Sequence, residues 1–313
     1  MIQTWKIPHM VKGTLTWVPV FNAWRLHRGS TGGTDSARYC YSAWLRHLVT
    51  LAPYGFRING ARVGELGPGD SIGIGLAALL SGAAQYTALD IVPFSAKANL
   101  ETIFDELLNM YLRQEAIPDN NEFPCLEPRL DSHDFPRHVL ELSNLSARSQ
   151  EIRNELTAGL SGGQPLLSYK APWTSVSDID PASLELIFSQ AVLEHVDDLD
   201  ETYQAMFAWL KPGGYASHVI DFSAHHLSPF WNGHWAYSDR EWQLVRGQRE
   251  FLLNRKPLSA HLACAEKVGF EILSIDRLRD NGGLNTKGLS ERFQALNCDD
   301  ARTRGAVLVL QKR

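Results

Sequence analysis

The chain has 313 residues, of which 44% are hydrophobic, and a formal net charge of −5. This length is enough for one large α/β domain with insertions, or for two domains. The mild acidity disfavours a nucleic-acid binder that relies on a basic surface. No apolar run approaches the roughly 18 residues of a membrane-spanning helix, and the first residues lack the apolar core of a signal peptide. The four cysteines lie far apart with no CxxC pair, which is typical of reduced thiols in a cytoplasmic protein and not of a disulfide framework or zinc knuckle.

Residues 1–60 are predicted to form a helical extension that precedes the main domain. The segment "GSTGGTDS", residues 29–36, is rich in glycine and small hydroxyl side chains, which favours either a mobile lid or a disordered loop. Residues 39–52 place apolar side chains at helical spacing and are predicted to form a helix. Tyr39, Tyr41 and Arg46 lie on this helix, which is a candidate to close the top of a ligand site.

A repeating strand–helix pattern begins at residue 61. Short apolar runs predict strands, and the longer amphipathic segments between them predict helices. Strands are expected at residues 62–66, 85–91, 165–169, 184–189, 215–222, 270–278 and 305–312. Helices are expected to begin near Asp70 and to occupy residues 95–113, 146–158, 198–210 and 259–269.

Two of these helices carry clear signals at their ends. Asp198 is predicted to cap one of them, with Glu201 three residues on as the second half of a capping box. The motif "KPGG", residues 211–214, is expected to stop that helix before the next strand. Ser259 is predicted to cap a later helix that ends at Gly269.

Two long insertions interrupt the pattern, near residues 115–147 and 223–258. The first contains four prolines between residues 117 and 137 and little periodicity, so it is expected to be irregular. The alternation elsewhere predicts a Rossmann-like, doubly wound α/β fold in residues 61–313. Its seven-stranded sheet is expected to be mostly parallel, with an antiparallel last strand.

The first strand runs into a glycine-rich turn. In open parallel sheets such turns lie where ligands bind, and Gly67 and Gly69 let the backbone approach a ligand closely. A dinucleotide fingerprint would need a third glycine at the position of Ile72. Glu65 and Asp70 flank the turn. Carboxylates there are unfavourable beside a pyrophosphate and suit a ligand with an amine, a sulfonium and ribose hydroxyls.

Asp90 ends the second predicted strand, 21 residues after Gly69. A carboxylate at this point is well placed to accept hydrogen bonds from ribose hydroxyls, although a lone acid there is also compatible with an ordinary surface residue. The turn, Asp90 and the strand order together predict a nucleoside site.

Four stretches together resemble class I S-adenosylmethionine-dependent methyltransferases of the small-molecule, type 11-like group. They are "GELGPGDS", "ALDI", "LELIFSQAVLEHVDDLDETYQAMFAWLKPGGY" and "AEKVGFEI", and the resemblance covers residues 61–313. It implies S-adenosylmethionine as the cofactor. It also implies a set of binding residues: Glu65, Gly67, Gly69, Asp70 and Ser71 along the methionine half, Asp90 at the ribose, Ile91 against adenine, and the backbone of Ser189 and Gln190 at the methionyl amine.

Two details of the resemblance stay open. Ser71 stands where the family often has a third glycine, so the turn departs from the family's pattern at this position. Trp173 follows the third predicted strand, and its ring is expected either near the adenine or in ordinary core packing.

Histidines gather after the fourth and fifth predicted strands, beside the expected position of the sulfonium. A hydroxyl acceptor benefits from a general base, and an imidazole oriented by a carboxylate suits that role. We expect His225 or His226 to be the base and Asp221 to orient it. His195 is a second candidate, or else a residue that makes local hydrogen bonds.

A metal site is the alternative use of these side chains. His218, Asp221, His225 and His226 are suitable ligand types for a divalent ion that binds a diol. Their spacing matches no metal motif, and His218 is expected to be a core histidine, so we assign no metal ligand.

The second insertion supplies aromatic side chains for either a stacking wall for a sugar or ring, or a cap that packs on the sheet edge. They are Phe230, Trp231, Trp235, Tyr237 and Trp242. The sequence therefore predicts a methyltransferase that O-methylates a small molecule or glycan, with no nucleic-acid partner and a homodimer left open. The alternatives are a nicotinamide-dependent oxidoreductase and a non-catalytic scaffold.

Overall fold

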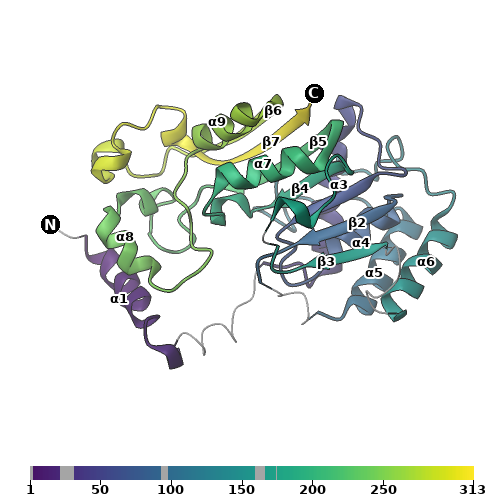
Figure 1. The fold of residues 1–313 in the computed structure, drawn as a ribbon, viewed down its shortest axis with the longest axis horizontal. Coiled ribbons are helices and arrows are strands. Elements are labelled where there is room, and N and C mark those ends of the chain that lie inside the picture. Colours follow the sequence, from purple (N-terminus) through teal and green to yellow (C-terminus); the bar gives the residue numbers. More distant parts are fainter. Residues whose placement is uncertain (1–2, 22–31, 93–97, 159–165, 174) are drawn as a thin grey trace.

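The chain folds around one seven-stranded sheet with helices on both faces (Figure 1). The computed structural model describes residues 3–21, 32–92, 98–158, 166–173 and 175–313. The strand order is β3-β2-β1-β4-β5-β7-β6. The strands are β1 Arg62–Leu66, β2 Gln85–Leu89, β3 Leu167–Lys170, β4 Leu184–Gln190, β5 Leu210–Asp221, β6 Phe270–Arg279 and β7 Thr303–Lys312.

The sheet has the predicted Rossmann-like arrangement. Strands β1 to β5 pair in parallel, whereas β7 is antiparallel to both of its neighbours, β5 and β6. The chain order reverses at β1, with β2 on one side and β4 on the other. In such sheets a ligand site lies beyond the carboxyl ends of the strands at this reversal.

Two groups of helices cover the sheet. Alternate side chains along β4 show the two faces, because Leu186 and Phe188 belong to the core under α3, α4 and α5, while Ile187 belongs to the core under α7 and α9. The helices are α1 Ile7–Leu15, α3 Ala37–Leu51, α4 Gly73–Leu80, α5 Leu100–Arg113, α6 Leu145–Ala158, α7 Leu199–Trp209, α8 Asp239–Arg246 and α9 Leu258–Val268. Short 3-10 helices are η1 Thr4–Lys6, η2 Ala52–Tyr54, η4 Val176–Asp178, η5 Leu193–His195, η6 Gly233–Ala236, η7 Thr286–Gly288, η8 Glu291–Phe293 and η9 Asp300–Arg302.

Several predicted boundaries are wrong. Helix α4 begins at Gly73 and not near Asp70. The "KPGG" motif does not separate helix from strand, because β5 already begins at Leu210. Ser259 lies inside α9, whose N-cap is Pro257. The Asp300 carboxylate accepts hydrogen bonds from the backbone N–H and the hydroxyl of Ser259, so a distant acid caps this helix.

Other boundaries agree with the pattern. Asp198 is the N-cap of α7 and accepts a hydrogen bond from the backbone N–H of Glu201 at 2.9 Å. Helix α5 is capped by Asn99, and the predicted start at residue 95 lies outside the described residues. None of the helices in the described ranges has both the length and the apolar character needed to cross a bilayer.

The N-terminal residues pack closely against the rest of the chain. In Figure 1, α1 lies against α8 of the second insertion, and α3 lies beside the sheet. Most of α3 is buried, and its residues belong to the same core as α4 and α5. The described part of residues 1–60 therefore packs against the rest of the chain, α1 on α8 and α3 in the core with α4 and α5.

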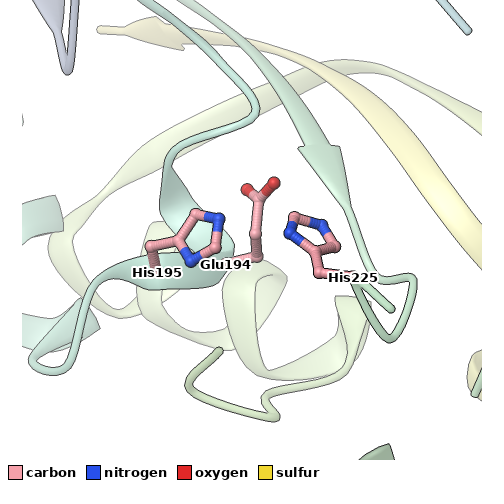
Figure 2. Close-up of side chains that lie close together, drawn as sticks. All are labelled: Glu194, His195 and His225. Carbon is pink, nitrogen blue, oxygen red and sulfur yellow. The ribbon is translucent and has the colours of Figure 1, made fainter. Parts of the chain in front are cut away.

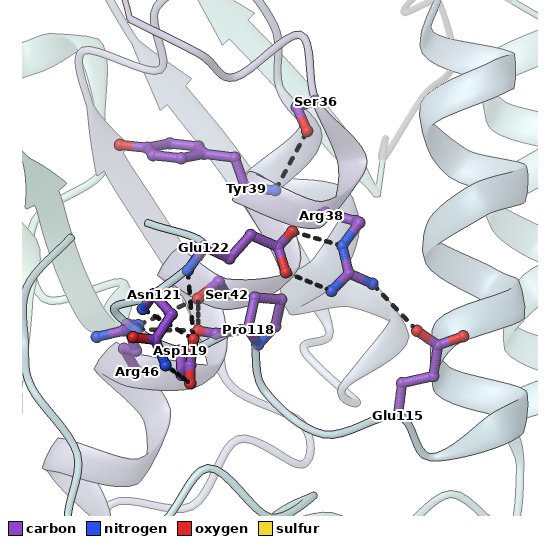
Figure 3. A network of polar contacts seen from close by, with 10 residues as sticks. All are labelled: Ser36, Arg38, Tyr39, Ser42, Arg46, Glu115, Pro118, Asp119, Asn121 and Glu122. Atoms are coloured by element: carbon purple, nitrogen blue, oxygen red, sulfur yellow. Dashed lines mark hydrogen bonds and ion pairs between the residues drawn. The ribbon is translucent and has the colours of Figure 1, made fainter. Parts of the chain in front are cut away.

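The first insertion contains no helix or strand between α5 and α6 among the described residues, as predicted. It is held against α3 by two arginines (Figure 3). Arg38 forms a two-point ion pair with Glu122, with N–O distances of 2.6 and 2.7 Å. The buried Arg46 guanidinium donates to the carbonyl groups of Pro118, Leu126 and Pro128. Arg46 thus has a structural role and does not line an open site.

Candidate active site

The residues predicted to bind the methyl donor, S-adenosylmethionine, lie together at the carboxyl ends of β1, β2 and β4. The glycine-rich turn after β1 is called the donor turn below. In the strand register, Leu66 of β1 stands opposite Leu89 of β2 on one side and Ser189 of β4 on the other. The residues that follow these three, Gly67, Asp90 and Gln190, therefore leave the sheet at the same edge. The backbone N–H of Gly67 donates to the carbonyl of Leu89 at 2.8 Å, which fixes the start of the turn.

The glycines of the turn are required by backbone conformation. Gly67 and Gly69 have φ angles of 63° and 73°, in the left-handed region that side chains rarely adopt. A Cβ at Gly67 would also lie 2.7 Å from the Val192 side chain. The turn therefore presents bare backbone at the edge where a ligand is expected, which fits a nucleoside-containing cofactor.

Ser71, at the position of the missing third glycine, ties the turn to the N-terminal segment. Its backbone N–H donates to the Thr34 hydroxyl at 3.0 Å, and its own hydroxyl donates to the Thr34 carbonyl. The Ser71 oxygen also accepts a hydrogen bond from the Gly73 N–H at 2.9 Å. Thr34 of the predicted lid therefore contacts the glycine-rich turn, and residues 29–31 fall outside the described residues.

Glu65 and Asp90, two acids beside the turn, have raised pKa values. Burial raises the pKa of the Glu65 carboxyl to about 8, although the Tyr86 hydroxyl donates to this carboxyl and opposes the shift. Burial also raises the pKa of Asp90, whose Oδ1 accepts the Ile91 N–H at 2.7 Å. Asp70 is 9% exposed. Both shifted carboxyls would gain from a cationic ligand, since a positive charge favours the ionised form.

Two residues beside Asp90, Ile91 and Trp173, are the candidates to contact the adenine; one is exposed and the other is packed. Ile91 is 40% exposed. The Trp173 backbone N–H donates to the Asp90 carbonyl at 2.9 Å, and its ring meets the buried Trp209 edge-on at 5.5 Å. The partly buried Trp173 ring therefore packs against the core on the α7 side of the sheet.

The end of β4 carries a buried polar network that the sequence did not indicate. The Ser189 hydroxyl pairs with His218 Nδ1 at 2.8 Å, and Gln190 Oε1 pairs with His47 Nε2 at 3.1 Å. His47, from α3, also contacts Ser217 at 2.7 Å. His218 is a fully buried core residue, as expected, and it is not part of the histidine group at the end of β5.

The end of β5 brings together two of the predicted catalytic residues. His225 Nε2 lies 3.2 Å from Asp221 Oδ2, while His226 is exposed and has no described contact with Asp221. Burial would raise the pKa of Asp221, but its contacts with His225 and Ser223 outweigh burial and lower that pKa. His225 and His226 have φ angles of 43° and 63°, a strained conformation that is commonest at functional sites.

His195 meets the same group from η5, together with an acid that sequence reasoning did not single out. The rings of His195 and His225 meet edge to face with their centroids 5.0 Å apart, and the Glu194 carboxylate lies close to both rings (Figure 2). Burial and the charge of His225 lower the pKa of His195 to about 4. Burial raises the pKa of Glu194 well above its ordinary value. Glu194 was visible in the "EHV" stretch, but adjacency in sequence did not show which neighbours it faces.

An open pocket of about 610 Å³ lies beside this group. Its lining includes Asp221, His225 and His226 from the end of β5, and Phe230 and Trp231 from the second insertion. The other aromatic residues of that insertion, Trp235, Tyr237 and Trp242, are buried. Both alternatives for these aromatic residues therefore apply, each to a different subset. Phe230 and Trp231 line a pocket, and Trp235, Tyr237 and Trp242 form a packed cap.

Residues 152–217, which run from α6 into β5, match a family model described as a methyltransferase domain. This match favours methyl transfer over the oxidoreductase and scaffold alternatives. The sequence has no match among curated proteins.

Solved structures that match this chain include several methyltransferases. An S-adenosylmethionine-dependent methyltransferase from Mesorhizobium loti shares 13% identity, with 84% of this chain and 96% of that chain covered and a TM-score of 0.41. One from Methanosarcina mazei shares 14% identity over 84% and 96% of the chains, with a TM-score of 0.41. Phosphoethanolamine N-methyltransferase 2 of Haemonchus contortus, in complex with S-adenosyl-L-methionine, shares 16% identity over 86% of this chain and 52% of its own, with a TM-score of 0.43.

Proposed function

We propose that this chain, an S-adenosylmethionine-dependent methyltransferase of the class I fold, methylates a hydroxyl group of a small polar acceptor such as a sugar or glycan unit. The observation that carries the proposal is the contact between His225 and Asp221 on the wall of the open pocket at the end of β5. A base next to a pocket of this size is what hydroxyl methylation needs.

The residues proposed to hold the cofactor are those at the edge formed by β1, β2 and β4. Gly67 and Gly69 present backbone to the methionine half, with Glu65, Asp70 and Ser71 around the same turn, and Asp90 accepts hydrogen bonds from the ribose. Ile91 packs against the adenine, and the backbone of Ser189 and Gln190 meets the methionyl amine. The left-handed conformation of both glycines and the carboxylate at the end of β2 support this arrangement.

The reaction needs one proton acceptor. S-Adenosylmethionine supplies a methyl group on a sulfonium: the S–CH3 bond breaks as the O–CH3 bond forms, and the electron pair of the broken bond stays on sulfur. The acceptor's hydroxyl proton passes to the imidazole of His225, and Asp221 holds that ring and stabilises its charged form. Asp221 is suited to this role because its lowered pKa keeps it ionised.

The residues that line the pocket favour a small polar molecule as the methyl acceptor. Phe230 and Trp231 offer aromatic surface for a sugar ring, while Asp221, Asp280 and Arg304 offer polar contacts on the same wall. His195 is a weaker candidate for the base, since its lowered pKa of about 4 makes it a poor proton acceptor near neutral pH.

The first test is calorimetric titration with S-adenosylmethionine and S-adenosylhomocysteine, with NADPH as the comparison ligand. We expect both sulfur compounds to bind and NADPH not to bind. Asp90→Asn is expected to weaken binding of both by at least about tenfold, because it removes the charge that accepts the ribose hydroxyl protons. Exclusive binding of NADPH would overturn the proposal.

The proton acceptor is tested by methyl transfer from labelled S-adenosylmethionine to a panel of sugars and small glycans. His225→Gln is expected to lower kcat by about 100-fold or more while cofactor affinity is kept. The matched control is His226→Gln, in the same loop and outside the Asp221 contact, which is expected to keep most of its activity. Equal activity of the two variants would contradict the role of His225.

A further inference from the structure

We propose that Glu194, His195 and His225 form a binding site for a divalent transition-metal cation next to the acceptor pocket. Each of the three offers one ligand atom, and these atoms lie within 4.8 Å of one another. The side chains come from two elements, η5 at the end of β4 and the loop after β5, and they converge on a common point (Figure 2). The inference rests on the proposed function for its role, but not for the existence of the site.

The buried carboxylate of Glu194 is the strongest sign of a missing ligand. Glu194 is 2% exposed, and neither of its oxygens has a hydrogen-bond partner among the described residues. The backbone N–H groups of Glu194 and Asp221 act to lower the pKa of this carboxyl, but neither has the distance and angle of a hydrogen bond to it. A buried carboxyl without partners is costly, and coordination to a cation removes that cost.

The imidazole of His195 also has a nitrogen without a hydrogen-bond partner among the described residues. This atom, Nδ1, is buried. A neutral imidazole with an available nitrogen is a good metal ligand, whereas a charged one is not. An unpartnered carboxylate and an imidazole with an unpartnered nitrogen therefore lie together with His225, each offering one ligand atom.

The donor set indicates the kind of cation. Two imidazole nitrogens and one carboxylate oxygen favour Mn²⁺, Fe²⁺ or Zn²⁺ over Mg²⁺, which prefers oxygen ligands alone. Three protein ligands leave positions free for substrate or water. Because Asp221 and His225 also line the open pocket, an acceptor in that pocket can reach such a position.

The cation would change the role of His225. A hydroxyl bound to a divalent cation loses its proton more readily than a free one. With the cation in place, His225 is a ligand and not a base; the proton of the cation-bound hydroxyl would then pass to water in the open pocket, and Asp221 would stay in contact with His225 at 3.2 Å. Without the cation, His225 is itself the proton acceptor. An acceptor with two adjacent hydroxyls suits the cation-bound form, since both oxygens can coordinate.

The test is Mn²⁺ binding to the chelator-treated full chain, followed by electron paramagnetic resonance without S-adenosylmethionine or acceptor. Mn²⁺ is chosen because it avoids the exposed thiols of Cys125 and Cys298. We expect one bound ion per chain, displaced by Zn²⁺ and displaced poorly by Mg²⁺. Glu194→Gln is expected to weaken Mn²⁺ binding at least about tenfold.

The matched control is His226→Gln, which is expected to bind Mn²⁺ as the unchanged chain does. If Glu194→Gln does not fold, as judged by circular dichroism, His195→Gln serves for the same comparison. Absence of a one-to-one complex, or equal binding by the ligand variant and the His226 control, overturns the proposal. Because cation binding is measured without turnover, a failure of the methyl-transfer assay leaves this result unaffected.

Discussion

Gly67 and Gly213 show how two glycines with similar backbones differ in what surrounds them. Their φ angles are 63° and 82°. A Cβ at Gly67 would lie 2.7 Å from Val192, whereas a Cβ at Gly213 would have no heavy atom within 4 Å among those described. Val192 belongs to the segment after β4 that leads into Glu194 and His195. Because Gly67 has no side chain, the donor turn can approach this segment closely.

Gly67→Ala is therefore expected to cost more than Gly213→Ala. Strain alone predicts a loss of about 1–2 kcal/mol in the free energy of unfolding for each, and overpacking against Val192 adds about 1–3 kcal/mol for Gly67. Urea unfolding measures the difference, and titration with S-adenosylmethionine is expected to show weakened binding for Gly67→Ala alone. Equal losses in stability would show that the Val192 contact relaxes freely.

At the scale of elements, α3 and the first insertion behave as one unit. Arg46 is 0% exposed and donates to the carbonyls of Pro118, Leu126 and Pro128. These carbonyls belong to a segment without regular structure, which has no strand or helix partners for them. The guanidinium replaces those partners, so α3 organises the insertion while it also contributes His47 to the end of β4.

Arg46→Met is expected to lower the free energy of unfolding by about 3–5 kcal/mol, because it leaves buried carbonyl groups without donors. Arg38→Met removes the two-point pair with Glu122, but Arg38 is 47% exposed, and its loss is expected to cost about 1 kcal/mol or less. Urea unfolding gives both values, and limited proteolysis should show faster cleavage within residues 115–147 for Arg46→Met. Similar stability of the two variants would contradict the role assigned to Arg46.

Element boundaries were predictable where the signal is local. The Asp198 cap of α7 involves an N–H three residues away, and β1 ends at Leu66, directly before the glycine-rich turn that begins at Gly67. The start of α9 was not predictable, because its cap comes from Asp300, 41 residues beyond Ser259. A partner at that separation leaves no periodic trace in the sequence.

At the scale of the whole molecule, buried neutral histidines link stability to pH. Burial lowers the pKa of His47 to about 4, and those of His218, His234 and His261 to about 3. In the unfolded chain these groups take up protons as pH falls through about 6.5, while the folded chain does not. Their contribution to stability is therefore complete above about pH 6.5 and is lost as pH falls toward 4.

The free energy of unfolding is expected to fall between pH 7 and pH 5, with each histidine contributing up to about 1.4 kcal/mol per pH unit. Glu65 acts in the opposite direction, because its pKa is raised to about 8 and its burial costs less as pH falls. Urea unfolding at several pH values measures the net slope. His261→Gln is expected to reduce this slope, because it removes one of the buried histidines. Constant stability over this range would refute the prediction.

The sequence by itself determined the sheet, the donor turn and the edge at which they meet, because parallel strands place their carboxyl ends together whatever the detailed packing. Glu65, Gly67, Asp90 and Ser189 could be assigned to that edge on this ground. The tertiary structure alone decided that Asp221 meets His225 and not His226, and that Glu194 lies close to two imidazoles. It also decided that Thr34 and His47 reach the strand ends. These contacts join side chains from separate elements, and their distances depend on backbone angles and packing that no local pattern encodes.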